Sequence, residues 1–481
     1  MWLLHNFHRP ARSQPARVAR ARSSAVNARL ILHIHAYIMS TLLTAIDGGQ
    51  LPLSALSVAS LGAWDASTRI EIAPGSELVQ AGSHTGILRD ANDDQHKHQI
   101  FLKKVTASLV ANKSWNDRRR ILLYIRNELR FYDEFAGTLR SRGVSIPAVS
   151  HMVDENLDGI EQYDEEPPPE LLSRCGALVF MEPLADPTRY EQTSPLTPSQ
   201  AKRLLSAAAR LHAAAWEDES LLSRAAERLQ RHGGSFALTA RNPKELRELP
   251  ASWDRFVAAF TPAAPPSFFS RPEIAALGSR LQALAPWISS QLSPKPNDRW
   301  ATLVHGDLKA MNVFLPVEGS DLPPQDVRES DDANATTCKS LPRDEAAVLI
   351  DFASTGVGVG MADVAMHLVH ALVPSDLDHG GEEALVDGYL AILAEARGAA
   401  ATASSPYPRE MALRHFRLAV CDYGRFIMGR FWGAATPERF SAAAASPNVV
   451  LANRNLASAL RFIERIHIYL AEFEEEQRAS T

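Results

Sequence analysis

Two apolar runs around a polar loop are the clearest feature in the pattern of hydrophobic and polar positions. Leu303-Val304 leads into a loop that holds a His, an Asp, a Lys and an Asn, and an apolar run then extends to Leu315. A second apolar run, residues 347–350, ends on one carboxylate. Such runs, rich in Val, Leu and Ile, predict short buried strands. We expect a β-ribbon that brings four side chains to one place: Asp307, Lys309, Asn312 and Asp351.

These four side chains indicate phosphate chemistry. Carboxylate and amide oxygens are ligands that Mg²⁺ prefers, and an ammonium group attracts phosphate oxygens. One carboxylate then remains to receive the proton of a hydroxyl group. The loop therefore predicts a site where a metal–phosphate complex meets an alcohol.

The chain before residue 183 has the pattern of a mostly β domain with one helix. Strands are expected at 69–73, within 78–87, at 99–105 and at 176–183. Gly82 lies in a turn of small residues, where a backbone can come close to phosphate oxygens. Pro183 ends the last run, because proline cannot continue a sheet ladder, and marks the boundary between two lobes.

One helix is predicted over residues 118–139, because apolar side chains recur there at helical spacing. Glu128 lies within the apolar stripe, and a carboxylate in that position is costly unless it is paired. Two interpretations fit. Glu128 forms an ion pair with a lysine of the preceding strand, as in sites that hold nucleotide phosphates, or it is a glutamate on the helix surface.

The chain after residue 183 has the pattern of a mainly helical domain. Thr197 begins a helix with a capping box, because Gln200 follows three residues later. The insert 316–346 is polar and lacks periodicity, so we expect a disordered segment or a mobile loop. Asp363 is placed to cap the helix that follows it. Helices are expected at 197–216, 273–292, 364–372, 382–396, 410–432 and 448–476.

Length and composition fit a globular protein of two lobes. The chain has 481 residues, 46% of them hydrophobic and 22% charged, and is too long for one ordinary core. A net charge of −6 gives no reason to expect nucleic-acid binding. No apolar run approaches the roughly 18 residues that a membrane span needs. Three widely spaced cysteines predict neither disulfides nor a zinc site and fit a reducing compartment: Cys175, Cys338 and Cys421.

Residues 1–40 differ from the rest of the chain. Arginine recurs there with Ser and Ala, and no acidic residue occurs before Asp47. Two interpretations fit: a transit peptide to an organelle such as a mitochondrion or plastid, or a mis-called start, with Met39 opening a shorter cytoplasmic protein. Both exclude the segment from the fold.

The order of these features is more specific than any one of them. A glycine turn, a strand lysine, a helix glutamate and an apolar strand precede the motif His-Gly-Asp-x4-Asn at 305–312, Ile-Asp-Phe at 350–352 and Asp-x-Ala at 363–365. This order resembles the aminoglycoside phosphotransferase and choline kinase superfamily, protein-kinase-like enzymes that phosphorylate small molecules. Residues 127–132, 211–216, 305–312 and 422–426 look closest to its ecdysteroid-kinase-like (CHK kinase-like) branch. The resemblance extends from residue 78 to the C-terminus, apart from the insert.

The resemblance implies an α+β, bilobal protein-kinase-like fold. A small β-rich N-lobe with one helix would occupy residues 41–182, and a larger, mainly helical C-lobe residues 183–481. It further implies a phosphotransferase that uses ATP and Mg²⁺ and has a small-molecule alcohol as its partner. Asp307 resembles the catalytic base and Lys309 the cation that meets the γ-phosphate, while Asn312 and Asp351 resemble the magnesium ligands.

Other positions would support these groups. His305 resembles a structural prop, and Asp363 resembles an aspartate that bonds the catalytic-loop backbone. Alternation along the strand puts Lys103 and Lys104 on opposite faces, so one of them can face the nucleotide. We choose Lys103, which completes an Ile-Phe-Leu-Lys pattern common to the family. The implied nucleotide contacts are Gly82, Lys103, Glu128 and the backbone of Phe180, Met181 and Glu182.

Two alternative functions fit parts of this pattern: a pseudokinase and a protein kinase. A non-catalytic pseudokinase or nucleotide-binding module usually lacks the base or a metal ligand, and this sequence has both. A protein kinase is disfavoured, because Gly306 replaces an arginine of many protein kinases and no Ala-Pro-Glu segment follows Asp351.

The sequence is compatible with three kinds of acceptor: choline or ethanolamine, a steroid-like alcohol and an amino sugar. Aromatic and acidic side chains of the C-lobe could line a pocket for a cationic or polycyclic alcohol, although such a stripe on a helix is more often core. These side chains are Trp216, Asp422, Tyr423, Phe426, Phe431 and Trp432.

Overall fold

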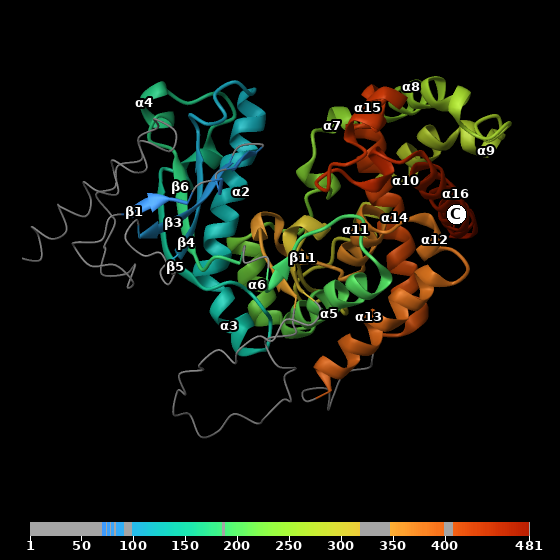
Figure 1. The fold of residues 1–481 in the computed structure, drawn as a ribbon. Helices are drawn as coiled ribbons and strands as arrows, with labels where there is room; N and C mark the ends of the chain where they lie inside the picture. The colour runs from blue at the N-terminus through green and yellow to red at the C-terminus, as the bar shows by residue number, and fades with distance from the viewer. Residues whose placement is uncertain are drawn as a thin grey trace, which may run out of the picture. The chain divides into compact units, whose positions relative to one another are not determined.

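The computed structural model describes residues 70–73, 75–76, 78–80, 83–90, 99–184, 188–317, 347–398 and 407–480 (Figure 1). The predictions for residues 1–40, for Gly82, for Cys338 and for positions 318–346 of the insert lie outside these ranges. The chain forms two compact units. The β unit comprises the described residues up to Leu122 together with Val149–Pro183, and the helical unit comprises Leu123–Ala148 together with the described residues from Leu184 onward.

The β unit is built on an antiparallel sheet of six described strands. Their order is β1-β3-β4-β6-β5, with β2 paired to β3. Strand β6 lies inside the sheet and is buried along its whole length, as its apolar sequence predicts. The elements of this unit are β1 (Ile70–Ile72), β2 (Leu78–Gln80), β3 (Ser83–Asp90), β4 (Gln99–Thr106), β5 (Val149–Glu155), β6 (Gly176–Met181) and the short helix α4 (Pro169–Leu172).

Helix α2, Trp115–Glu134, begins in the β unit and continues in the helical unit. The sequence predicted one helix over 118–139 and assigned all of it to the first lobe. The structure instead has a break at Phe135, whose φ of −121° is not helical, and a second helix α3 (Ala136–Ser141) follows. The part of α2 after Leu122 groups with the helical unit because its side chains hold the loop after Asp351.

The helical unit is formed mainly by long amphipathic helices. Helix α5 (Pro198–Ala215) begins with the predicted capping box: Thr197 accepts from the Gln200 amide, and the Gln200 side chain accepts from the Thr197 amide at 2.9 Å. The helices that follow it, four of them with only four to seven residues, are α6 (Glu219–Arg228), α7 (Pro243–Arg247), α8 (Leu249–Phe260), α9 (Pro272–Ala275), α10 (Leu277–Gln291), α11 (Met361–Ala371), α12 (Pro374–Leu377), α13 (Gly381–Arg397), α14 (Arg409–Arg430), α15 (Pro437–Ala443) and α16 (Leu456–Ser480).

Short strand pairs carry the polar loop of the helical unit. Strand β9 (Val313–Pro316) pairs with β10 (Val348–Leu349) and β7 (Tyr190–Glu191), so the predicted ribbon forms between these two apolar runs. The apolar run before the loop belongs to β8 (Thr302–Val304), which pairs with β11 (Gly356–Gly358) instead. The loop therefore leaves one strand pair and enters another.

The predicted α+β class is confirmed, and so is the division into a small β-rich part and a larger, mainly helical part. Among the described residues, no helix combines the length and apolar character that crossing a bilayer demands. Cys175 and Cys421 are both buried free thiols.

Candidate active site

Asp307 is the centre of a polar cluster in the loop between β8 and β9. Its Oδ2 lies 3.3 Å from the Lys309 Nζ, and its Oδ1 accepts a hydrogen bond of 3.2 Å from the Ser235 hydroxyl. The side chains of Asp307 and Lys309 are each about a quarter exposed, at 22% and 25%. The carboxylate is thus held by Lys309 and Ser235 and still reaches solvent or a bound molecule.

The amide orientation of Asn312 is determined by Asp307. The Asn312 Nδ2 donates to the Asp307 carbonyl at 2.8 Å and to its Oδ2 at 3.1 Å. Both partners are acceptors only, so nitrogen must occupy this position. The two contacts use both hydrogens of the amide and leave its oxygen as the group that can coordinate a cation.

His305 supports the loop and is not a second base. Its Nε2 lies 2.9 Å from the Ile350 carbonyl, so this nitrogen must donate. Its Nδ1 accepts from the Asp307 amide at 3.3 Å. Both ring nitrogens are engaged with backbone, which agrees with the structural role that the resemblance implies.

Asp363 binds the backbone of the same loop through both of its carboxylate oxygens. Its Oδ2 accepts from the His305 amide at 2.7 Å and its Oδ1 from the Gly306 amide at 2.9 Å. His212 Nε2 lies 3.1 Å from Oδ2 and, on its other side, the ring contacts Tyr389. The backbone-binding role is therefore confirmed, whereas the predicted helix cap is wrong: Gly360 caps α11, and Asp363 lies in its first turn.

Buried hydrogen bonds hold Asp363 in its charged form. Burial alone would raise the pKa of this carboxyl group, but the hydrogen bond and charge of His212 and the Gly306 amide outweigh it, so the pKa lies below its ordinary value. The loop backbone is consequently bound by a carboxylate rather than by a neutral acid.

Asp351 follows the ribbon in a strained conformation. Its φ of 65° and ψ of 62° lie in the left-handed region, which a non-glycine residue adopts only when its surroundings impose it. The next residue supplies that constraint: the Phe352 ring stacks on Phe131 at 3.8 Å and lies 4.9 Å from the His305 ring. Asn127 donates to the Phe352 and Thr355 carbonyls at 3.3 and 3.0 Å. Helix α2 thus fixes the segment that carries Asp351.

Glu128 lies in the part of α2 that belongs to the helical unit. Its residue exposure is 1%, so the surface interpretation is wrong. Burial raises the pKa of Tyr132, and the charges of Glu128 and Asp351 raise it further, which places both carboxylates near the same phenol. A buried carboxylate requires compensation. The ion pair of Glu128 with a strand lysine stays a prediction.

A second segment, residues 230–236, lies along the loop and was not predicted. The Ser235 amide donates to the Gly306 carbonyl at 2.8 Å, and the Gly234 amide donates to the Ser354 carbonyl at 3.0 Å. Gly306 has φ +82°, and a Cβ there would lie 2.1 Å from the Ser354 carbonyl oxygen. Close packing of three backbones therefore requires glycine at this position.

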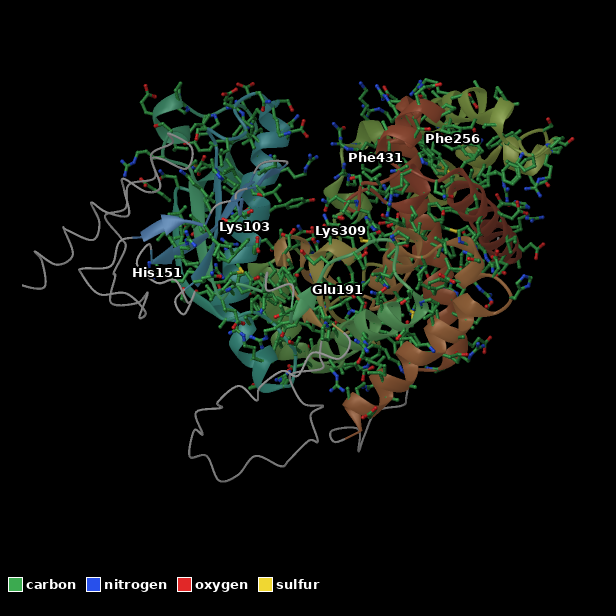
Figure 2. The ribbon with its side chains drawn as sticks, viewed as in Figure 1. Lys103, His151, Glu191, Phe256, Lys309 and Phe431 are labelled. Carbon is green, nitrogen blue, oxygen red and sulfur yellow. The ribbon has the colours of Figure 1, made fainter. Side chains whose placement is uncertain are left out.

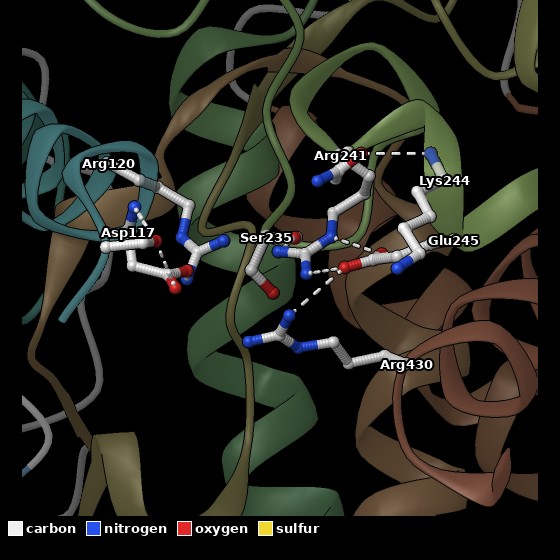
Figure 3. A network of polar contacts seen from close by, with 9 residues as sticks. Asp117, Arg120, Ser235, Arg241, Lys244, Glu245 and Arg430 are labelled. Atoms are coloured by element: carbon white, nitrogen blue, oxygen red, sulfur yellow. Dashed lines mark hydrogen bonds and ion pairs between the residues drawn. The ribbon is translucent and has the colours of Figure 1, made fainter. Parts of the chain in front are cut away.

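An arginine network supports this segment (Figure 3). Arg241 forms a two-pronged ion pair with Glu245, at 2.9 and 2.6 Å, and Arg430 reaches the same carboxylate at 3.3 Å. The Arg241 Nη1 also lies 3.5 Å from the Ser235 carbonyl. Because two-pronged pairs are geometrically specific, they restrict where Ser235 can place its hydroxyl.

We expect Ser235→Ala to reduce kcat about tenfold with little change in KM, because one donor that orients the Asp307 carboxylate is lost. Steady-state kinetics of the phosphoryl transfer that the sequence predicts, at saturating nucleotide, measure both constants. Ser235→Thr retains a hydroxyl and should restore part of the loss. Ser293→Ala is the matched control, since its hydroxyl bonds only a helix-end carbonyl, at 2.8 Å. An equal loss in both alanine variants would exclude a positioning role.

A cavity of about 390 Å³ opens beside Asp307, and all of its lining belongs to the helical unit. Asp307, Lys309 and Ser235 contribute to its wall, and most of the remaining wall is apolar. Figure 2 labels Lys309 and Phe431, two of the lining residues. Pockets of this volume hold drug-sized ligands.

The six predicted acceptor residues divide into two groups. Tyr423, Phe426 and Phe431 line the cavity. Trp216, Asp422 and Trp432 do not: Trp216 packs on Tyr407, Asp422 forms an ion pair with Arg425 at 2.7 Å, and Trp432 is buried against Phe256 with ring centroids 4.1 Å apart. Half of the predicted aromatic and acidic pocket is therefore core.

The predicted nucleotide contacts of the β unit lie on β4 and at the end of β6. Phe180 and Met181 are buried and Glu182 follows the strand directly. The two lysines differ: Lys104 is 1% exposed and shares its face with Ile100 and Leu102, whereas Lys103 lies on the half-exposed face. An ammonium buried so completely must be compensated, so burial favours Lys104 as the lysine with a structural charge partner. The nucleotide contact of Lys103 stays a prediction.

Within the described residues, no group of three or more His, Cys, Asp and Glu side chains is arranged to hold a metal ion. The predicted metal ligands, Asn312 and Asp351, are one amide and one carboxylate, so they do not form such a group. Residues 312 and 351 flank the paired strands β9 and β10, and the Ile350 amide donates to the Asn312 carbonyl at 3.0 Å. One carboxylate and one amide oxygen suit a hard cation that takes its remaining ligands from phosphate and water.

No protein-family model matches the chain, and no curated protein matches it. Solved structures include a microcompartment-associated aminopropanol kinase, at 16% identity over 88% of this chain and 98% of that one, with a TM-score of 0.42. An aminoglycoside phosphotransferase from Alicyclobacillus acidocaldarius follows at 12% identity over 89% and 98%, with a TM-score of 0.39. A choline kinase from Cryptosporidium parvum is 9% identical over 85% and 90%, also at 0.39. These identities and TM-scores are too low to assign a function to this chain.

Proposed function

We propose that this protein is an ATP-dependent small-molecule kinase that transfers the γ-phosphate to a hydroxyl group. The observation that carries the proposal is the Asp307 cluster: a carboxylate held by Ser235 and Asn312, paired with Lys309 at 3.3 Å, and lining a ligand-sized cavity. A base, a cation and an acceptor space adjoin one another there. Phosphoryl transfer needs little more from a protein than such positioning and charge.

Asp307 would accept the proton of the attacking hydroxyl. The hydroxyl oxygen forms its bond to the γ-phosphorus while the bond from that phosphorus to the bridging oxygen of ADP breaks. Lys309, whose Nζ lies 3.3 Å from Asp307 Oδ2, would meet the charge on the transferring group. Asn312 and Asp351 would hold Mg²⁺, which when bound supplies positive charge to the nucleotide phosphates.

The β unit would supply the nucleotide contacts. Lys103 or Lys104 on β4 offers the ammonium group for the phosphates, and the backbone after Phe180 offers donors and acceptors for adenine. Glu128, buried in the helical unit, is the proposed partner of the strand lysine. Membership of the ecdysteroid-kinase-like branch rests on the sequence resemblance alone.

A screen of ATP consumption across alcohol classes tests the proposal, with Asp307→Asn as the blank. Choline, ethanolamine, polycyclic alcohols and amino sugars are the acceptors, and labelled phosphate is traced to the product. Transfer to at least one alcohol above the blank is expected. Label found only on casein would indicate a protein kinase, and nucleotide binding without transfer to any acceptor would indicate a pseudokinase.

A further inference from the structure

The cavity beside Asp307 has a wall that is mostly apolar. Ten of its eighteen lining residues are Ala, Val, Ile, Met or Phe. Three aromatic side chains of this wall lie close together: Phe426 lies 6.0 Å from Tyr423 and 5.5 Å from Phe431, centroid to centroid. An apolar acceptor in this space would bury apolar surface, which favours its binding.

The charges of the cavity do not favour a cationic acceptor. Asp307 is the only acidic residue among the described lining residues, and the proposed function assigns it to the proton of the acceptor hydroxyl. The third charged lining residue, Arg439, is also a cation. Burial, aided by the Lys309 charge, lowers the pKa of His370 to about 3, so this lining residue is neutral near pH 7.

The two features that suggested a cation site are both engaged within the protein. Asp422 is 4% exposed and its charge is compensated by Arg425, which also donates to the Phe236 carbonyl. The guanidinium of Arg241 lies 4.9 Å from the Phe426 ring centroid, so this ring already interacts with a cation of the protein. Asp422 and one face of the Phe426 ring are therefore engaged by cations of the protein itself.

Resting on the proposed function, we infer that the acceptor is an uncharged, predominantly apolar alcohol of drug-like size, and that the apolar, cation-lined cavity rejects amino alcohols. Moving an ammonium group from water into such a wall without a carboxylate partner is unfavourable. A neutral ring system meets only apolar and aromatic surface, with its hydroxyl directed at Asp307.

A matched pair of acceptors tests this. 2-(2-Naphthyl)ethanol is neutral, and 2-amino-2-(2-naphthyl)ethanol differs by one ammonium group at neutral pH. The neutral alcohol is expected to have a kcat/KM about tenfold or more above that of the amine, since leaving one charge unpaired amounts to at least 1.4 kcal/mol. Binding of each to the Asp307→Asn variant, followed by naphthalene fluorescence, should show the same order.

Phe431→Asp then supplies the missing carboxylate. Phe431 is 43% exposed, so the change is tolerated by the fold. It should lower the neutral-to-amine ratio about tenfold, whereas Phe431→Leu, which keeps the wall apolar, should leave the ratio unchanged. The inference is overturned if the unaltered protein prefers the amine or binds neither compound. In either case, ATP-dependent phosphate transfer to any other alcohol would still support the kinase proposal. Selective binding of the neutral alcohol without ATP-dependent transfer to any acceptor supports the inference about the cavity and overturns the kinase proposal.

Discussion

Asp307→Asn is expected to reduce the rate of phosphoryl transfer about 10³-fold, the range that a lost general base produces. Nucleotide affinity should be almost unchanged, because no step of nucleotide binding uses this proton acceptor. ATP consumption and calorimetric titration with the nucleotide measure the two quantities. Turnover equal to that of the unaltered protein would contradict the mechanism.

The folded state should tolerate this change, because the contacts of Asp307 can be rearranged. An asparagine can keep its oxygen toward Asn312 and Lys309 and turn its amide nitrogen toward the Ser235 oxygen, which can accept as well as donate. The free energy of unfolding should therefore change by less than about 0.5 kcal/mol. A large loss of stability would make the kinetic result uninformative about the base, and Ser235→Ala then becomes the decisive variant.

The sequence predicted the parts of the site that lie within one short segment. Asp307, Lys309 and Asn312 are separated by a few residues, so one loop suffices to bring them together, and the pairing of β9 with β10 brings Asp351 beside them. The two apolar runs predict paired strands, and the position of the polar residues at the ends of these runs predicts that the residues lie close together.

The supports of the site were harder to predict, because they come from distant segments. Ser235 lies 72 residues before Asp307, and Asn127 lies 225 residues before the Phe352 carbonyl that it binds. Neither has a local pattern that distinguishes it from other serines and asparagines. Asp363 was assigned its backbone contacts through the resemblance, while local capping rules suggested a different role.

For one residue of the predicted acceptor pocket, Asp422, the sequence already contained evidence against a role in substrate binding. Asp422 and Arg425 are three residues apart on one helix, a spacing at which opposite charges meet. This spacing indicates that the carboxylate is compensated and unavailable to a cationic substrate. The burial of Trp432 against Phe256, by contrast, depends on the packing of helices far apart in the chain.

Asp363→Asn is expected to destabilise the helical unit by about 3 kcal/mol, although the substitution is the same as at position 307. Oxygen Oδ1 of Asp363 accepts from the Gly306 amide, and Oδ2 accepts from the His305 amide. Whichever position the new NH₂ group takes, it faces a backbone N–H that cannot reverse its role. Urea unfolding measures the loss, and Asp387→Asn, at a half-exposed pair with Arg409, should change stability by less than about 0.5 kcal/mol.

The pH dependence gives an independent check on Asp363. Its pKa is lowered in the folded protein from an ordinary value near 3.8, so its carboxylate stabilises the fold at every pH above that value. This stabilisation declines as the pH falls from the ordinary value to the lower, folded value and is absent below both. The difference in unfolding free energy between the protein and Asp363→Asn should thus be constant from about pH 7 to about pH 5 and shrink below about pH 4. A difference that does not shrink in acid would show that the carboxylate charge is not what holds the backbone of residues 305 and 306.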